Sequence, residues 1–366
     1  MSLTLSRRIK QTPFTDILKL NGVKGYTVYN RTLLATVFDS LIDDYKHLKS
    51  SVQLWDVSCQ NQIEIVGKDA LRLLQNITSR NLTSISTNRC MYIPIVDKNG
   101  KIINDPVLTK INNTTFRLSC SDSDLYLWIQ GVICGTTLEV EIVKKNIFTL
   151  AVQGPKSVNL MSNVFGNKIN ELKFFGVDKF KLLNEEFLIS RTGFSKQDGF
   201  EISIADQGKC IPLWNILYEA GQSLDVKAGC PNLIERIEGG LLSYGNDMTE
   251  VNSPLECGLE KFCSLNEKIN YLGKDSLLRE KSSGLLKVIR SISIDASSLP
   301  QCNQPWPIKF KNKEVGQITS AAYSPDFKTN VSLGMIDLDY LSMSANLKVE
   351  VLSNLYSIKI QKKSFI

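Results

Sequence analysis

The stretch QIEIVGKDALRLLQNIT, residues 62–78, decides the fold class because a strand pattern is followed at once by a helical one. In QIEIVG, residues 62–67, apolar and polar side chains alternate as they do in a half-buried strand. In KDALRLLQNIT, residues 68–78, the apolar residues recur at helical spacing. The strand pattern returns in TFRLSC, residues 115–120. This mixture predicts α+β domains.

Toward the C-terminus the same mixture continues and then changes. A second α/β block runs from about residue 146 to 250, with strands in FTLAVQ and EFLISRTGF and amphipathic helices in GKCIPLWNILYEAGQSL and NLIERIEGGLLSYG. From about residue 281 onward nearly every pattern is that of a strand, and Asn, Gly, Ser and Pro mark the turns. We therefore expect a small C-terminal β-barrel or sandwich.

The composition is that of a globular protein, with 43% hydrophobic and 22% charged residues among 366. A chain of this length is expected to form two or three domains. The net charge of +6 is spread along the chain, so we expect no nucleic-acid partner. The start, MSLTLSRRIKQ, has no apolar signal segment, and no run of about 18 apolar residues follows. We expect a cytoplasmic protein without a membrane partner.

The sequence offers few ligands for a metal or a nucleotide. His47 is the single histidine, which excludes a Ser-His-Asp triad and a multi-histidine metal site. Nine cysteines without CxxC spacing indicate reduced thiols and no metal. Neither a GxGxxG motif nor a phosphate-binding loop is present. From the residues alone, the chain is an α+β enzyme whose acid or base chemistry rests on carboxylates, tyrosines or the substrate.

Five segments, in register along nearly the whole chain, carry a resemblance to a known family. They are WDVSCQNQIEIVGKDALRLLQNITSRNL at 55–82, GKIINDP at 100–106, LAVQGPKS at 150–157, RTGFSKQDGFEI at 191–202 and GCPNLIERIEGGLLSYGNDM at 229–248. Together they resemble the glycine-cleavage T-protein (aminomethyltransferase) family. The amino-acid sequence of the last segment is similar to that of the dimethylsulfoniopropionate demethylase branch in particular.

The resemblance implies an α+β, three-domain cloverleaf around a central channel in which tetrahydrofolate is bent. The first domain would comprise residues 1–51 and 145–236, and the second residues 52–144 and 237–280. Residues 281–366 would form the C-terminal β-barrel. The implied activity is transfer of a methyl group from a small donor, dimethylsulfoniopropionate or a related compound, to tetrahydrofolate, which gives 5-methyltetrahydrofolate.

Two carboxylates match family positions with assigned roles. Asp105, in GKIINDP, matches the aspartate beside the reactive nitrogen of the folate, where it would stabilise positive charge in the transition state. Alternatively, Asn-Asp-Pro is a turn in which the aspartate accepts a backbone hydrogen bond. Glu201, in GFEI, matches the glutamate that holds the N–H donors of the pterin ring. Its alternative is a strand glutamate on a solvated face.

Three further residues are implied in folate binding. Tyr92 occupies an aromatic position at the folate channel, with a core aromatic as its alternative. Arg236 and Tyr244 are expected on one amphipathic helix. Arg236 would pair with a folate carboxylate or form an ion pair within the helix through Glu235 or its neighbours. Asn232 stands where T-proteins commonly place an arginine, which argues against a T-protein mode of tail binding.

A cationic donor would be received by aromatic faces through cation–π attraction. The candidates are Phe174, Phe175, Phe194 and Phe200, each of which has a packed core phenylalanine as its alternative. Ser203 is also expected at the donor site. Compared with the demethylase branch, Phe194 replaces a tryptophan and Ser203 stands where a tyrosine is expected.

These departures keep other donors open, among them a different sulfonium, a methylated amine and a methoxy compound. A glycine-cleavage aminomethyltransferase is the alternative function, and it needs a lipoyl-carrier partner. A folate-binding role in iron–sulfur assembly is disfavoured, because GCPNLIERIE lacks that branch's cysteine signature. We expect a small-molecule methyl donor as partner, and a homodimer is one open alternative.

Overall fold

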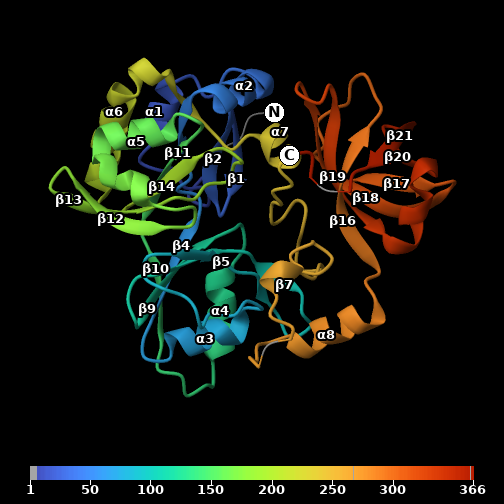
Figure 1. The fold of residues 1–366 in the computed structure, drawn as a ribbon, viewed down its shortest axis with the longest axis horizontal. Coiled ribbons are helices and arrows are strands. Elements are labelled where there is room, and N and C mark those ends of the chain that lie inside the picture. Colours follow the sequence, from blue (N-terminus) through green and yellow to red (C-terminus); the bar gives the residue numbers. More distant parts are fainter. Residues whose placement is uncertain (1–5, 267, 363) are drawn as a thin grey trace. The chain divides into compact units, whose positions relative to one another are not determined.

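The computed structural model describes residues 6–266, 268–362 and 364–366, which form two compact units (Figure 1). The first unit contains the described residues up to Leu71 together with Thr83–Tyr92 and Pro106–Asn232. The second contains Arg72–Leu82, Ile93–Asp105 and Leu233–Ile366. Throughout the described ranges, no helix combines the length and the apolar character needed to span a bilayer.

The first unit contains a six-stranded sheet in which β15 runs parallel to β3 and the other neighbours are antiparallel. In spatial order its strands are β12 (Val177–Leu182), β13 (Glu185–Ser190), β14 (Gly199–Ile204), β11 (Phe148–Gln153), β3 (Val52–Asp56) and β15 (Val226–Gly229). The helices α5 (Ser157–Phe165) and α6 (Cys210–Ala220) pack against this sheet (Figure 1).

Successive side chains of β14 point alternately to the two faces of this sheet. Phe200, Ile202 and Ile204 are buried in the apolar core with α5 and α6. Because successive side chains in a strand point to opposite faces, Glu201 and Ser203 point away from that core. One strand therefore supplies both the packing of the unit and a polar surface.

A five-stranded antiparallel sheet is the other large sheet of the first unit. In spatial order its strands are β10 (Glu141–Lys145), β4 (Asn61–Val66), β9 (Thr115–Cys120), β8 (Val107–Lys110) and β5 (Cys90–Tyr92). The remaining helices and strands of the unit are α1 (Thr15–Leu20), β1 (Gly25–Tyr29), β2 (Thr32–Val37), α2 (Leu41–Ser50), α4 (Leu125–Ile133) and the 3₁₀ helices η1 (Asn167–Glu171), η2 (Gln207–Lys209) and η3 (Gln222–Leu224).

The second unit is built around a closed six-stranded barrel (Figure 1). Around the barrel the order is β16 (Lys287–Ile294), β19 (Thr329–Asp337), β18 (Lys313–Ser324), β17 (Trp306–Phe310), β20 (Leu347–Val351) and β21 (Asn354–Ile360). Other elements are the pair β6 (Ile95–Val96) and β7 (Ile102–Asn104), α7 (Leu233–Glu238), α8 (Lys274–Ser283), η4 (Glu260–Phe262) and η5 (Leu338–Asn346). The helix α3 (Ala70–Ile77) starts in the first unit and continues in the second.

The structure confirms the α+β class and the C-terminal barrel. The strand and helix expected in residues 62–78 are β4 and α3, and the strand at 115–120 is β9. The helix expected over NLIERIEGGLLSYG is wrong in extent, because α7 ends at Glu238. The next residues are Gly239 and Gly240, and Gly240 has a φ of 64°, which favours glycine and ends the helix. The assignment to three domains stays a prediction.

Candidate functional site

The two sheets of the first unit turn polar faces toward a small shared cavity. Side chains from eight of their strands, four in each sheet, line this cavity. Its lining is Gln62, Cys90, Val107, Thr109, Arg117, Ser119, Thr149, Val177, Leu188, Ser190, Glu201 and Ser203. The volume is about 30 Å³, which is room for about one water molecule. A cavity of this size receives the edge of a ligand, not a whole ring system.

Glu201 is the carboxylate of this cavity, and its partner is a hydroxyl group. Thr192 donates a hydrogen bond from Oγ1 to Oε2 of Glu201. Burial of the carboxyl raises the pKa of Glu201, and the hydrogen bond from Thr192 lowers it. Among the described residues no Lys or Arg forms an ion pair with Glu201. A carboxylate in this setting is suited to a ligand that brings its own N–H donors.

The loop before β14 is fixed by a buried amide, Gln153 at the end of β11. Nε2 of Gln153 donates to the carbonyl oxygen of Thr192 at 3.1 Å, and Oε1 accepts from Oγ of Ser195 at 2.8 Å. Gly193 and Gly199 leave space for this amide, since a Cβ added at either would lie 2.2 Å from Nε2. The segment that presents Glu201 is thus held from beneath by one side chain.

Tyr92 lies on the cavity-facing side of the five-stranded sheet. In the β5–β8 pairing, Cys90 is opposite Thr109 and Tyr92 is opposite Val107. Cys90, Thr109 and Val107 line the cavity, and Tyr92 shares their face by the alternation of the strand. Tyr92 is half-buried. Its folate contact stays a prediction.

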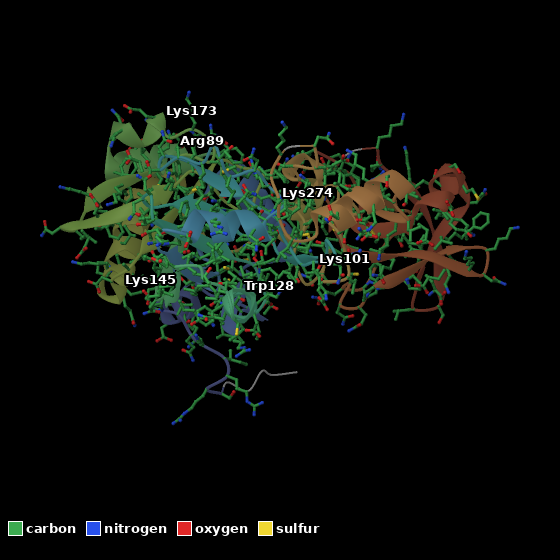
Figure 2. All side chains as sticks on the ribbon, turned by 90° about the horizontal axis from the view of Figure 1, so that it is seen from below. Arg89, Lys101, Trp128, Lys145, Lys173 and Lys274 are labelled. Carbon is green, nitrogen blue, oxygen red and sulfur yellow. The ribbon has the colours of Figure 1, made fainter. Side chains whose placement is uncertain are left out.

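The loop that carries Phe174 and Phe175 is tied to the edge of this site. The carbonyl oxygen of Phe175 accepts from the backbone N–H of Cys90 at 2.8 Å. Arg89 donates to the carbonyl oxygen of Phe174 at 3.5 Å, and Figure 2 shows Arg89 and Lys173 on the same side of the first unit. Phe175 is half-buried, whereas Phe174 is 69% exposed and packs edge-on against it.

Three residues expected to contact the methyl donor remain, and they lie on different sides of the sheet or in its loop. Ser203 lines the cavity, and Phe194 is half-buried in the loop held by Gln153. Phe200 is fully buried in the apolar core behind the sheet. Phe200 directly precedes Glu201 in the strand, so it points to the opposite face. The expectation for Phe200 is therefore corrected, and its core alternative holds.

Asp105 lies in the second unit, directly after β7, and is half-buried. The hydroxyl of Tyr244 donates to the carbonyl oxygen of Ile102 in β7 at 3.2 Å. Burial raises the pKa of Tyr244 to about 12, and the charges of Glu250 and Asp105 add to this effect. Tyr244 thus lies within electrostatic range of Asp105 and is bound to the strand that leads into it.

Two known domain families match this chain. The GCVT N-terminal domain family matches residues 14–267, and the glycine cleavage T-protein C-terminal barrel domain matches residues 289–366. The chain belongs to the glycine cleavage T-protein family. The resemblance carried by the five segments is confirmed.

Two curated relatives span the whole T-protein architecture. The chain is 42% identical to dimethylsulfoniopropionate demethylase DmdA of Ruegeria pomeroyi, over 99% of this chain and 98% of the relative. It is 29% identical to an aminomethyltransferase of Caldanaerobacter subterraneus subsp. tengcongensis, over 98% and 96%. The crystal structure of glycine cleavage system aminomethyltransferase T from Bartonella henselae superimposes with a TM-score of 0.88 at 19% identity, covering 98% of both chains. That likeness shows the fold.

Membership in the T-protein family defines the reaction class. The family transfers one-carbon units, and tetrahydrofolate is the acceptor. The protein is therefore a tetrahydrofolate-dependent one-carbon transferase. The expectations for the activity class and for the folate are confirmed.

Arg236 does not fit the folate-tail role expected from the T-protein resemblance. Nη1 of Arg236 donates to Asp247 at 2.7 Å and to the carbonyl oxygen of Leu241 at 3.3 Å, and Nη2 donates to Ser320 at 2.7 Å. The side chain is 8% exposed, and that of Asp247 is fully buried. Arg236 thus forms a structural ion pair, but with Asp247 beyond the end of α7 instead of with Glu235 in the helix. These contacts argue against the folate-tail role, which stays a prediction.

Tyr244 also differs from its expected place. It lies beyond the end of α7, so it does not share a helix with Arg236. Its ring is 8% exposed and packs with Ile102, Met248 and Cys257. The role of Tyr244 in folate binding stays a prediction that this burial does not favour.

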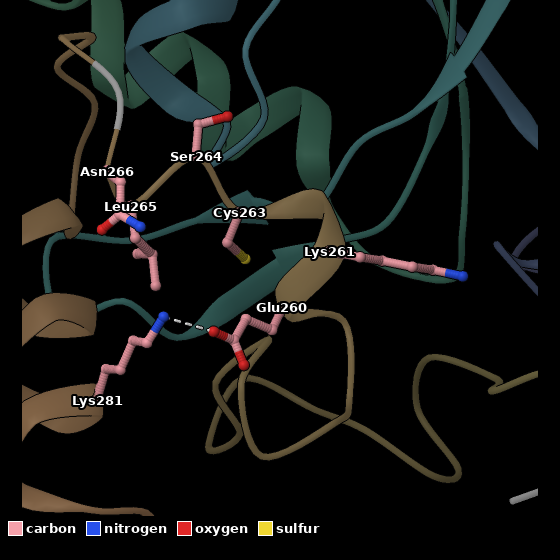
Figure 3. A pocket seen from close by; sticks show the side chains of 7 residues that line it. All are labelled: Glu260, Lys261, Cys263, Ser264, Leu265, Asn266 and Lys281. Carbon is pink, nitrogen blue, oxygen red and sulfur yellow. Dashed lines mark ion pairs between the residues drawn. The ribbon is translucent and has the colours of Figure 1, made fainter.

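A larger cavity of about 420 Å³ in the second unit contains none of the expected site residues (Figure 3). Figure 3 shows that Lys281 and Glu260 face each other across it, and their ion pair measures 2.7 Å. Both side chains are about half exposed, so the pair contributes little to stability. Lys261 is a second lysine of this lining, and Figure 3 shows its side chain pointing away from the others. The lining indicates no ligand class.

Sequence reasoning missed Thr192 and Gln153. Both belong to segments quoted for the resemblance, but their chemistry depends on contacts with residues about ten and forty positions away. The available signal was the pair of glycines around FSKQD, which indicated that something approaches the backbone closely there. The amide that fills the space could be identified only from the fold.

Proposed function

We propose that this protein transfers an intact methyl group from dimethylsulfoniopropionate, or a closely related sulfonium compound, to tetrahydrofolate. The supporting observation is the 42% identity to dimethylsulfoniopropionate demethylase DmdA over nearly the full length of both chains. The aminomethyltransferase relatives reach 29% over a similar span. The products are 5-methyltetrahydrofolate and a neutral thioether.

The residues of the first unit fit the pterin end of the folate. Glu201 offers a carboxylate oxygen beside the one that Thr192 occupies, and pterin presents adjacent N–H donors. Tyr92 adds an aromatic ring on the facing sheet. We therefore assign pterin orientation to Glu201 and contact with the ring to Tyr92.

Asp105 is assigned the stabilisation of charge at the reacting nitrogen. When bound, tetrahydrofolate would supply the amine that accepts the methyl carbon. The electron pair of the S–CH₃ bond would stay on sulfur, and the proton of the amine would pass to solvent. Positive charge moves from sulfur toward nitrogen during this transfer. A half-buried carboxylate stabilises that charge more in the transition state than in the ground state.

The donor's sulfonium group is already activated, so its binding site needs mainly to align it. Phe175 and Phe194 are half-buried aromatic residues of the first unit and are assigned to cation–π contact with the donor. Phe174 packs edge-on against Phe175 and extends this aromatic surface toward solvent. Ser203 supplies a small polar group in the cavity beside Glu201.

A panel of donors tests the proposal. Purified protein and tetrahydrofolate are incubated with dimethylsulfoniopropionate, other methylated sulfonium compounds, methylated amines and methoxy compounds, and the folate products are resolved by mass spectrometry. We expect 5-methyltetrahydrofolate with a sulfonium donor. A product with an amine or methoxy donor alone would reassign the substrate.

A second assay distinguishes the proposed function from the glycine-cleavage alternative. That reaction uses an aminomethyl group on a lipoylated carrier protein and releases ammonia. We expect neither ammonia release nor capture of the protein by that carrier. Ammonia formed together with methylenetetrahydrofolate would contradict the demethylase assignment.

A further inference from the structure

In the first unit, hydrogen bonds connect three side chains in a row that ends at Glu201. Oγ1 of Thr192 donates to Oε2 of Glu201, and a second hydroxyl, Oγ of Ser190, lies 2.6 Å from Oγ1 of Thr192. A hydroxyl has one proton to donate, and that of Thr192 is directed at the carboxylate. Ser190 must therefore be the donor to Thr192. The hydrogen bonds run in one direction, from Ser190 through Thr192 to Glu201.

Strand pairing and a buried amide fix the positions of these three side chains. Ser190 and Glu201 are directly paired across β13 and β14. Thr192 is 5% exposed, and its carbonyl oxygen accepts from the fully buried Gln153. Gly193 and Gly199 can be replaced by no larger residue without displacing Gln153. Thr192 therefore has little freedom to move away from the carboxylate.

We propose that Thr192, held in place by Gln153, is a positioning residue that fixes the orientation of the Glu201 carboxylate for folate binding. This inference rests on the proposed role of Glu201. With Oε2 engaged by Thr192, Oε1 would accept from the N–H donors of the pterin. The hydroxyl also stabilises the ionised carboxylate, since a hydrogen bond to the charged form opposes the cost of its desolvation.

The surroundings of Glu201 make its protonation measurable. The other ionisable groups that line the cavity are Cys90 on β5 and Arg117 on β9. Burial raises the pKa of Cys90 to about 11, so this thiol stays neutral near pH 7. Arg117 forms an ion pair with Glu64 at 2.8 Å. Of the groups that line this cavity, Glu201, whose pKa burial raises, is therefore the one expected to respond when tetrahydrofolate affinity is measured from pH 5 to about 8.

The test compares tetrahydrofolate affinity, measured by calorimetry under anaerobic conditions across this pH range, among matched variants. Thr192→Val removes the hydroxyl at nearly constant shape, and Thr192→Ser keeps it. Thr319→Val is the control, because Thr319 also donates to a buried carboxylate, Asp247, at 2.8 Å, but in the barrel unit. Glu201→Gln tests the proposed function itself.

Thr192→Val is expected to weaken tetrahydrofolate binding by roughly tenfold at neutral pH. It should also move the pH below which binding is lost to a higher value, because the pKa of Glu201 rises further without the hydrogen bond. Thr192→Ser should retain the wild-type profile. Thr319→Val should lower the melting temperature and leave the folate profile unchanged.

The outcomes separate the two claims. If Glu201→Gln weakens binding but Thr192→Val follows the wild-type profile, the positioning role is wrong and the proposed function stands. The same holds if Thr192→Ser behaves like Thr192→Val, because the hydroxyl would then not be the relevant group. If Glu201→Gln binds tetrahydrofolate as well as wild type does, the assigned role of Glu201 fails and the positioning role fails with it.

Discussion

Asp105 is the residue whose charge matters most to the proposed chemistry. Asp105→Asn keeps the shape of the side chain and removes the charge that would stabilise the methylated nitrogen. We expect kcat to fall on the order of a hundredfold, with tetrahydrofolate affinity changed less than about threefold. Single-turnover kinetics and calorimetry measure the two effects. Asp275→Asn, at an exposed position of α8, is the matched control and should change neither.

His47 makes stability depend on pH. Nε2 lies 2.9 Å from the carbonyl oxygen of Asp225, and Nδ1 lies 3.3 Å from the amide nitrogen of Gln53. The neutral ring satisfies both contacts, with Nδ1 accepting and Nε2 donating. Burial lowers the pKa of His47, with an opposing effect from Asp225.

The unfolded chain therefore binds the histidine proton at a higher pH than the folded chain does. The contribution of His47 to the free energy of unfolding is complete above about pH 6.5 and falls as the pH drops toward the lower folded pKa. Urea unfolding of wild type and His47→Gln between pH 7.5 and 5.5 isolates this effect. The difference between the two proteins should change with pH, and a constant difference would contradict the assignment.

At the scale of single residues, the sequence predicted Glu201 and Ser203 at the cavity but also Phe200, which is in the core. The alternation of β14 was sufficient to exclude Phe200 once Glu201 was assigned to the ligand. Arg236 was harder, because its partners Asp247 and Ser320 come from the following loop and from the barrel. No local pattern connects residues so far apart.

Buried polar contacts connect the short helix α7 to the rest of the second unit. Arg236 joins it to Asp247 and to β18, and Ser324 of β18 donates to Glu238 at 2.5 Å. Arg236→Met would leave the carboxylate of Asp247 buried without its cation. We expect the free energy of unfolding to fall by about 3–5 kcal/mol, measured by urea denaturation.

The double variant Arg236→Met with Asp247→Leu should recover part of this loss, because no unpaired charge then remains in the core. Tetrahydrofolate affinity should be unchanged in both variants at a temperature where they are folded. A large loss of affinity in the folded single variant would restore the folate-tail role that the buried ion pair argues against.

At the scale of elements, the sequence predicted β4, α3, β9 and the C-terminal barrel, because their hydrophobic periodicity is regular. It overextended α7, whose apolar residues continue past Glu238. Two consecutive glycines were the local signal for its end, and all of residues 234–238 are buried, which weakens any amphipathic pattern. Periodicity predicts where a segment can be helical, and the turn residues decide where the helix ends.

At the scale of the whole molecule, tetrahydrofolate should stabilise the folded protein. A ligand that binds only the native state adds about 2.7 kcal/mol at a concentration one hundred times its Kd. We expect a rise in melting temperature that increases with the logarithm of the tetrahydrofolate concentration. Glu201→Gln should reduce this rise, and an undiminished rise would remove Glu201 from the folate site.

The central claim is that the methyl group moves intact from a sulfonium sulfur to the folate nitrogen. Dimethylsulfoniopropionate with fully deuterated methyl groups tests it in a single turnover, with the folate product analysed by mass spectrometry. Direct transfer predicts 5-methyltetrahydrofolate that retains all three deuterium atoms, together with an equal amount of thioether. A folate product that carries two deuterium atoms or none would contradict direct methyl transfer.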